Sequence, residues 1–247
     1  MGTTVAIGRA VGGRRLEDAA HAIGNTITLF MIVAVVFTAG LLCFVRPIVL
    51  LIGTPEQAIA GSIRYLTICF IGIPFITAYN IISSIFRGMG DSKSPMYFIG
   101  IACMGNIVLD YFFIGAMQLG PAGAALGTTL SQTFSVIIAL ISMMKRKTGI
   151  LSEKKTISVR IKKVMWQILR VGFPVAVQDG CIQIAFIIIT VIANHRGLND
   201  AAAVGIVEKM ISAIFIIPSS MLATVSALSA QNIGAGKHDR ASQTLKY

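Results

Sequence analysis

Six apolar stretches, each long enough to cross a lipid bilayer, constrain this chain more than any other feature. A helix needs about 20 apolar residues to span the hydrocarbon core. Stretches of this kind occupy residues 25–45, 60–86, 95–117, 122–144, 165–193 and 203–230. They lack the two-residue alternation of a barrel strand, and only 13% of all residues are charged. The sequence therefore predicts an all-α polytopic membrane protein with six transmembrane helices.

Basic residues gather in alternate connections between these stretches. Sixteen lie on one side of the expected helices and three on the other: Arg9, Arg14, Arg15, Arg87, Lys93, Lys145, Arg146, Lys147, Lys154, Lys155, Arg160, Lys162, Lys163, Lys237, Arg240 and Lys246 against Arg46, Arg64 and Arg196. Such an excess marks the cytoplasmic side of a membrane protein, so we expect both termini there. The net charge of +11 is then directed at anionic lipid headgroups of the bilayer and not at nucleic acid.

One short motif occurs twice. Val11–Ala19 (VGGRRLEDA) and Ile233–Ala241 (IGAGKHDRA) each combine a Gly-rich turn, a basic residue and a charged stretch that ends on Ala. A repeated motif belongs to a repeated supersecondary unit. The long apolar run before the second copy has no counterpart before the first. We therefore expect the chain to be a slice through a larger membrane protein with a two-fold repeat.

The longest polar segment, residues 145–163, separates four apolar stretches from two. In a repeated transporter, a segment of this kind joins two lobes; an ordinary long cytoplasmic loop is the alternative. We expect residues 1–144 to form most of an N-terminal lobe, 145–163 to be a cytoplasmic linker, and 164–247 to start a C-terminal lobe.

Polar residues inside the apolar stretches are the candidates for a functional site, because a charge at bilayer depth is costly. Asp110 lies far from both ends of its stretch, and Asn106 lies four residues earlier, on the same helical face. A carboxylate and an amide oxygen on one face suit a hard cation or a proton, and Thr128 follows in the next stretch. A polar clamp between helices, without an ion, is the alternative.

The fifth stretch holds a second candidate pair, Gln178 and Asp179. Asp179 would line a central cleft and attract cationic substrates. Alternatively, its carboxylate reaches water or a donor on a neighbouring helix.

The residues that would carry metal or nucleotide chemistry are missing from the sequence. Its histidines are scattered, and its cysteines form no CxxC pair and are expected to be small buried side chains in apolar stretches; they are Cys43, Cys69, Cys103 and Cys181. No GxxxxGK[ST] phosphate loop is present. We expect no cofactor, no metal beyond a coupling ion and no enzymatic activity.

The loops and helix interiors carry a resemblance. FRGMGDSKSP (Phe86–Pro95), NIVLDYFFI (Asn106–Ile114), LGPAGAALGTTLSQ (Leu119–Gln132), GFPVAVQ (Gly172–Gln178) and the segment 203–241 follow one another in an order and spacing that resembles the multidrug and toxic compound extrusion (MATE) family of bacterial efflux transporters. The resemblance implies a partial two-lobe, inverted-V fold that runs from just before the third helix through the eighth. The remaining helices of the full-length transporter would then be missing.

The resemblance also implies a function. It is multidrug efflux by antiport of small organic, cationic substrates across the bacterial cytoplasmic membrane, driven by Na⁺ or H⁺. By motif position, Asn106, Asp110 and Thr128 coincide with residues that coordinate a cation in some members, and Gln178 fits the family pattern. Asp179 matches no expected acidic position, and Ile182 lies where one branch carries a glutamate.

Two alternatives stay open at this point. A lipid-linked oligosaccharide flippase of the same superfamily would share the lobes but would carry a more cationic central cavity. A non-transporting truncated remnant is the other alternative.

The asymmetry of basic residues predicts which connections face the cytoplasm. In a cysteine-free background, a single cysteine at Ser152 should resist a membrane-impermeant thiol reagent added outside intact cells, because the 145–163 linker is expected inside. A cysteine at Thr54 should react. Strong labelling at Ser152 with protection at Thr54 would reverse the assignment.

Overall fold

The structure is a computed structural model that describes residues 1–51, 56–145, 162–196 and 198–244. Within these ranges the chain is helical and has no strand. The helices are α1 (Gly2–Gly12), α2 (Leu16–Cys43), α3 (Val45–Leu51), α4 (Glu56–Gly88), α5 (Lys93–Asp110), the π-helix η1 (Tyr111–Ala116), α6 (Pro121–Lys145), α9 (Lys162–Arg196), α10 (Leu198–Gly234) and α11 (His238–Gln243). Most of the expected 145–163 linker lies outside the described residues.

Six spans in the described part are long and apolar enough to cross a membrane: Leu16–Cys43, Ile59–Gly88, Lys93–Ala116, Pro121–Lys145, Val164–Ala193 and Ala203–Gly234. The prediction of six spanning helices is confirmed. The first spanning helix, α2, begins at Leu16, nine residues before the expected start at residue 25. Glu17 and Asp18 in its first turn support this earlier start because they interact favourably with the helix dipole. The short helices α1, α3 and α11 were not predicted, since none is long enough to give a bilayer-length apolar signal.

The expectation that all four cysteines are buried is wrong. Cys43, Cys103 and Cys181 are exposed, Cys69 is partly buried, and all four are free thiols. The side chains of Cys43, Cys103 and Cys181 lie on helix faces that no other described segment covers. In a membrane protein an apolar residue on such a face can contact lipid, so an apolar sequence environment does not imply burial within the chain.

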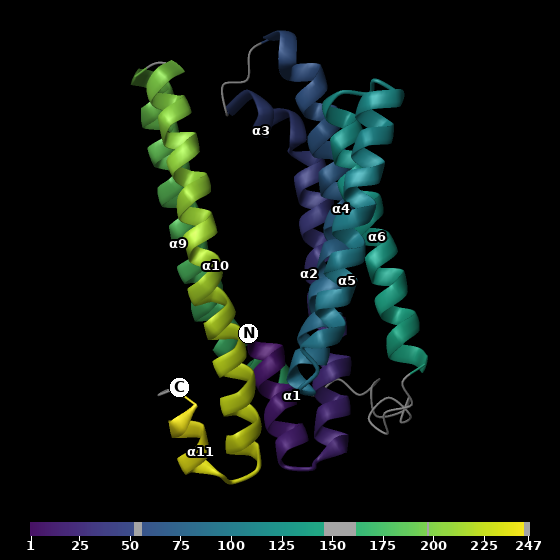
Figure 1. Cartoon of the computed structure of the whole chain (residues 1–247), viewed down its shortest axis with the longest axis vertical. Coiled ribbons are helices and arrows are strands. Elements are labelled where there is room, and N and C mark those ends of the chain that lie inside the picture. Colours follow the sequence, from purple (N-terminus) through teal and green to yellow (C-terminus); the bar gives the residue numbers. More distant parts are fainter. Residues whose placement is uncertain (52–55, 146–161, 197, 245–247) are drawn as a thin grey trace.

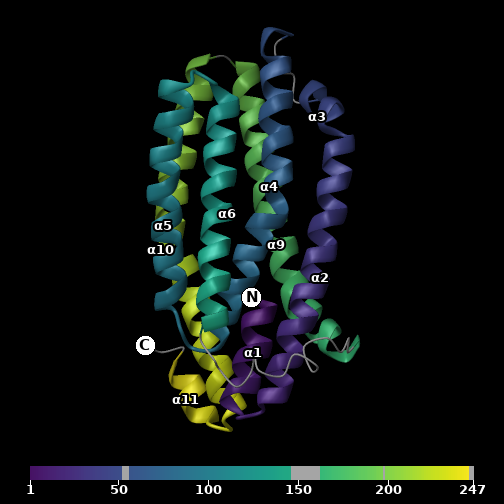
Figure 2. The same ribbon diagram turned by 90° about the vertical axis from the view of Figure 1, so that its right-hand side faces the viewer.

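The helices form two arms that diverge from a common base. In Figure 1, α2, α4, α5 and α6 form one arm, and α9 and α10 form the other, with α1 at the base where the arms meet. Figure 2 shows the same arms from the side, with both chain ends and α11 at the base. The most apolar windows of α9 and α10 have no buried residue, so the second arm is held to the first mainly at the base.

Two apolar clusters form the core of the base and of the first arm. Ile7 of α1, Ile23 of α2 and Ile85 of α4 belong to one cluster. The other cluster joins α4, α5 and α6, where the rings of Phe86 and Phe98 pack edge to face with centroids 5.6 Å apart. Such a pair adds to the free energy of burial. The first arm is therefore a packed helical unit that carries α1 with it.

The arms meet where α1 crosses α10, and the contact is reciprocal. A Cβ atom on Gly12 would overlap the backbone oxygen of Gln231, and a Cβ atom on Gly234 would overlap the backbone oxygen of Arg9. Gly234 lies 222 positions after Gly12, and Gln231 lies 222 positions after Arg9. The contact between Gly12 and Gln231 thus joins the same two repeat positions as the contact between Gly234 and Arg9, as a two-fold axis requires.

The turns that follow the two helices have the same hydrogen bonds. After α1, the Gly13 amide donates to the Arg9 oxygen at 3.1 Å and the Arg15 amide to the Ala10 oxygen at 2.9 Å. After α10, the bonds at the equivalent positions join Ala235 to Gln231 at 3.0 Å and Lys237 to Asn232 at 2.9 Å. Both are Schellman-type helix ends. Arg14 and Gly236 take the left-handed conformation in them, with φ values of 55° and 73°.

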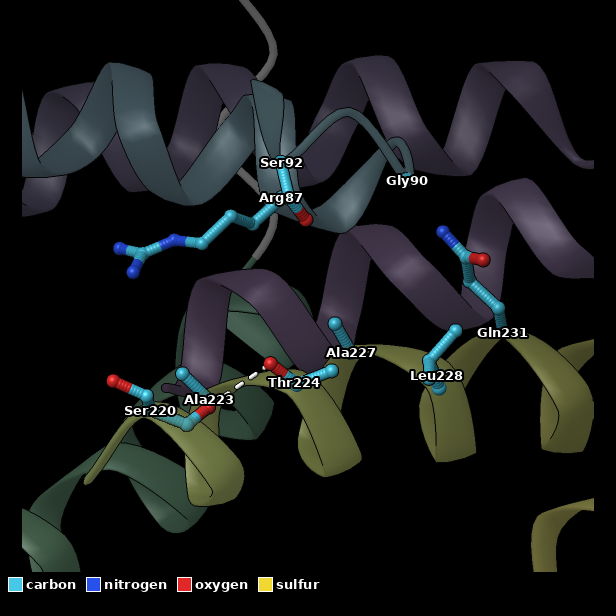
Figure 3. A pocket seen from close by; sticks show the side chains of 9 residues that line it. All are labelled: Arg87, Gly90, Ser92, Ser220, Ala223, Thr224, Ala227, Leu228 and Gln231. Atoms are coloured by element: carbon cyan, nitrogen blue, oxygen red, sulfur yellow. Dashed lines mark hydrogen bonds between the residues drawn. The ribbon is translucent and has the colours of Figure 1, made fainter. Parts of the chain in front are cut away.

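One side-chain hydrogen bond also links the arms at the base. The Gln231 Nε2 atom on α10 donates to the Gly88 backbone oxygen at the end of α4, at 3.0 Å. Figure 3 shows the Gln231 amide directed toward the turn that contains Gly90; both residues line a cavity of about 280 Å³. This bond satisfies a carbonyl at a helix C-terminus that has no partner within its own helix.

The reciprocal crossing predicts equal sensitivity at its two glycines. Gly12→Ala and Gly234→Ala should each lower the thermal unfolding midpoint of the purified chain in detergent, because each new methyl group meets a backbone oxygen; overpacking of this kind costs about 1–3 kcal/mol. Gly61→Ala is the control, since nothing lies within 4 Å of its Cβ position. Midpoints for Gly12→Ala and Gly234→Ala that match the Gly61→Ala midpoint would contradict the crossing.

Candidate functional site

The structure brings Asn106, Asp110 and Thr128 together between α5 and α6. The Asn106 Nδ2 atom donates to Asp110 Oδ1 at 3.3 Å and lies 3.4 Å from Thr128 Oγ1. Asn106 and Asp110 are one turn apart on α5, as expected for neighbours on one helical face. Thr128 comes from α6, so the constellation joins two spanning helices.

Small residues on α6 allow this close approach. Gly123, Gly127, Ser131 and Ser135 recur every four residues and are all buried. A Cβ atom on Gly123 would lie 3.1 Å from the Phe113 backbone, and the Ser135 hydroxyl donates to the Phe98 oxygen at 2.9 Å. Stripes of small residues let membrane helices pack with their backbones close together. The Asp110 carboxylate can therefore lie directly against α6.

A change of helix type follows Asp110. The α-helix α5 ends at this residue and continues as the π-helix η1. At the C-terminal end of η1, the Met117 amide donates to the Phe112 oxygen at 3.0 Å. A π-helical turn contains an extra residue and rotates the helix that follows it. No signal in the sequence predicts this turn, because its residues, Tyr111–Ala116, continue the apolar stretch without a break.

The constellation is open on one side. Asn106 and Asp110 are half-buried and Thr128 is exposed. In the part of the chain that the structure describes, Asp110 forms no ion pair, and no three His, Cys, Asp or Glu side chains gather as metal ligands. The available ligands are a carboxylate, a hydroxyl and an amide. Oxygen donors of this set fit a hard cation or a proton and do not fit a transition metal.

The structure does not bring Gln178 and Asp179 to this constellation. Both residues lie on α9, in the other arm, and both are exposed. Asp179 acts on the base of the structure through its charge. Burial and the Arg87 guanidinium lower the pKa of the Met1 amino group, and the Asp179 carboxylate raises it. Asp179 is therefore close enough to Met1, at the start of α1, for its charge to act there.

Sequence reasoning missed the residues that line the cavity at the base. Arg87 and Gln231 line the cavity in Figure 3 together with Ser92, Ser220 and Thr224. Arg87 donates from Nε to the Ser83 oxygen at 3.3 Å within its own helix. For Gln231 the sequence did offer a signal. It occupies the position in the second repeat that Arg9 occupies in the first, and repeated units tend to meet across an axis of symmetry.

Comparison with known proteins identifies a family for most of the chain. The protein family described as MatE matches residues 1–112 and 174–247. These ranges include Asn106, Asp110, Gln178 and Asp179; Thr128 lies outside them. The "Probable multidrug resistance protein YoeA" of Bacillus subtilis (strain 168) is 31% identical over 252 residues, which cover 99% of this chain and 54% of that protein.

Two further matches agree. The "Probable multidrug resistance protein YpnP" of Bacillus subtilis (strain 168) is 34% identical over 194 residues, covering 77% of this chain and 42% of that protein. A crystal structure described as MATE in complex with MaL6 superimposes with a TM-score of 0.88 at 25% identity, and covers 100% of this chain and 55% of the other. The chain spans about half the length of the relatives it matches.

Proposed function

The chain belongs to the MatE family of multidrug efflux transporters, and we propose on this basis that it acts within a secondary transporter of a bacterial cytoplasmic membrane. The transporter exports small organic compounds by antiport against a cation, Na⁺ or H⁺. Binding and translocation of this kind require no covalent chemistry.

The observation that carries the proposal is the Asp110 carboxylate, which lies inside a candidate membrane span and close to Asn106 and Thr128. An ionised carboxylate at such a depth is costly unless it is neutralised. The one polar hydrogen donated to it in the described residues comes from a neutral amide. A cation or a proton at Asp110 would supply the missing positive charge, and its release on the other side of the membrane would couple the gradient to transport.

The Asn106 amide gives this site two arrangements. With its NH₂ group toward Asp110 Oδ1 and Thr128 Oγ1, the amide acts as a clamp between two oxygen atoms. After a half-turn about its Cβ–Cγ bond, the amide would present its carbonyl oxygen in the same place, because the two ends of an amide differ only in hydrogen-bonding type. Three oxygen atoms would then face one cation. The clamp and the cation site are thus two states of one constellation.

The space between the arms would hold the substrate. Asp179 and Gln178 are exposed on α9, and the Asp179 charge acts on the Met1 amino group at the start of α1. An exposed carboxylate attracts organic cations through its charge, and an amide orients polar groups through hydrogen bonds. We assign these two residues to recognition of small cationic substrates.

The orientation follows from the basic residues. With Arg9, Arg87 and Lys237 at the cytoplasmic side, the base of the two arms faces the cytoplasm and the gap between them opens outward. Residues 1–144 then belong to the first lobe and residues 164–247 to the second. The linker 145–163 would then connect the two lobes on the cytoplasmic side. Alternating access requires the arms to separate at the base and close at the other end.

The proposed coupling predicts a sharp effect at Asp110. In membrane vesicles that contain the whole transporter, Asp110→Asn should abolish substrate efflux driven by an imposed Na⁺ or proton gradient, because an amide neither titrates nor carries charge. Thr128→Ala should retain efflux with an apparent cation affinity about tenfold weaker, the equivalent of roughly 1.4 kcal/mol for one lost ligand. Protein levels in the vesicles are matched before the rates are compared.

Asp179→Asn serves as the companion variant in the other arm. It should change which substrates are exported, with cationic compounds reduced most, and leave the dependence on the gradient unaltered. Efflux at the wild-type rate by Asp110→Asn would leave Asn106 as a structural clamp and remove the coupling role.

A further inference from the structure

Gly127 on α6 lies directly against the Asp110 carboxylate. A Cβ atom built on this glycine would overlap Asp110 Oδ1 and would lie 3.3 Å from both Cγ and the backbone nitrogen of Asp110. Gly127 is buried and directly precedes Thr128. The carboxylate therefore occupies the space that a side chain at position 127 would fill.

Other glycines of the two helices show that this contact is particular. Gly100 and Gly115 have nothing within 4 Å of a Cβ position, and Gly105 has only the Ser131 Cβ at 3.9 Å. Gly123 meets the backbone of Phe113, so its role is to let the helices approach. At Gly127 the atom in the way is the end of a side chain. A methyl group there can be accommodated if the Asp110 carboxylate swings aside and the Asp110 backbone nitrogen, 3.3 Å away, gives by a few tenths of an ångström.

We propose that Gly127 is a positioning residue that keeps the Asp110 carboxylate in place between Asn106 and Thr128. The proposal gives Gly127 a role in discriminating between coupling ions, and this part rests on the proposed function. A metal cation needs several oxygen atoms at fixed positions around it, whereas a proton needs only the carboxylate. Displacement of the carboxylate should therefore remove metal-ion binding and spare protonation.

The positional part can be tested by a double-mutant cycle on the purified chain, without any transport. Gly127→Ala is compared in the Asp110 background and in an Asp110→Ala background, in which the overlapping oxygen is gone. We expect Gly127→Ala to lower the thermal unfolding midpoint when Asp110 is present, because the bond to Asn106 is lost. It should lower the midpoint much less in the Asp110→Ala background, because the overlapping oxygen is gone and alanine favours helix over glycine. Asp110→Ser provides the second background if Asp110→Ala does not fold.

The ion part uses the same samples with NaCl or choline chloride at equal ionic strength. If Na⁺ binds, the wild-type midpoint rises with NaCl. Gly127→Ala should then need at least about tenfold more Na⁺ for the same rise, which corresponds to roughly 1.4 kcal/mol. Gly100→Ala is the matched control on α5 and should respond as the wild type does.

The outcomes separate the two claims. Equal shifts from Gly127→Ala in both backgrounds, or a Na⁺ response of Gly127→Ala equal to that of Gly100→Ala, would overturn the role of Gly127. A much smaller loss in the Asp110→Ala background with no Na⁺ response in the wild type would support the positioning of Asp110, overturn the discrimination of ions by Gly127 and count against Na⁺ as the coupling ion.

Discussion

The contact on which the two-arm arrangement depends is the crossing of α1 and α10 at the base. Gly12 lies against the backbone oxygen of Gln231, and Gly234 lies against the backbone oxygen of Arg9, the residue equivalent to Gln231 in the first repeat. Approach this close is possible because glycine has no side chain, and it brings Cα hydrogens to carbonyl oxygens across the interface. The long apolar windows of α9 and α10 contribute no buried residue. The angle between the arms is therefore set at the base, and small changes there move the open ends by large amounts.

The crossing of α1 and α10 joins the two arms, and the Asp110 constellation is the proposed ion site. The constellation lies within the first arm, between α5 and α6, so the proposed ion would act on the packing of this one helical unit. The cluster of Phe86 and Phe98 joins these helices to the end of α4. Gly88, at that end, accepts the hydrogen bond from Gln231. This cluster lies on the same two helices as the proposed ion site and includes the end of α4 that the hydrogen bond links to the other arm. Packed networks with two arrangements can couple distant sites in this way.

The sequence predicted the parts of the structure that depend on strong, local patterns. Bilayer-length apolar runs predicted the six spanning helices, and the four-residue spacing of Asn106 and Asp110 predicted their shared face. The matching motifs at Val11–Ala19 and Ile233–Ala241 predicted a repeated unit, and the two turns have equivalent hydrogen bonds. These features depend on periodicity and turn chemistry, which a single sequence contains.

Other features depend on contacts between distant segments, and the sequence did not reveal them. The π-helix Tyr111–Ala116 continues an apolar stretch and has no local signal. The close approach of Gly127 to Asp110 is visible only after α5 and α6 are packed together. The exposure of Cys103 and Cys181 depends on which faces the other helices cover. Only the arrangement in space decides these points, since the same residues are compatible with several packings.

The central claim is that an ion at Asp110 controls the angle between the arms. The most direct measurement is the distance between spin labels at the open ends, on cysteines replacing Gly61 near the start of α4 and Ala203 near the start of α10, in a transporter that lacks the native cysteines. The account predicts that Na⁺ or acid shifts the distance distribution in the Asp110 protein and has no effect after Asp110→Asn. A distribution that ignores both Na⁺ and pH with Asp110 intact would contradict it.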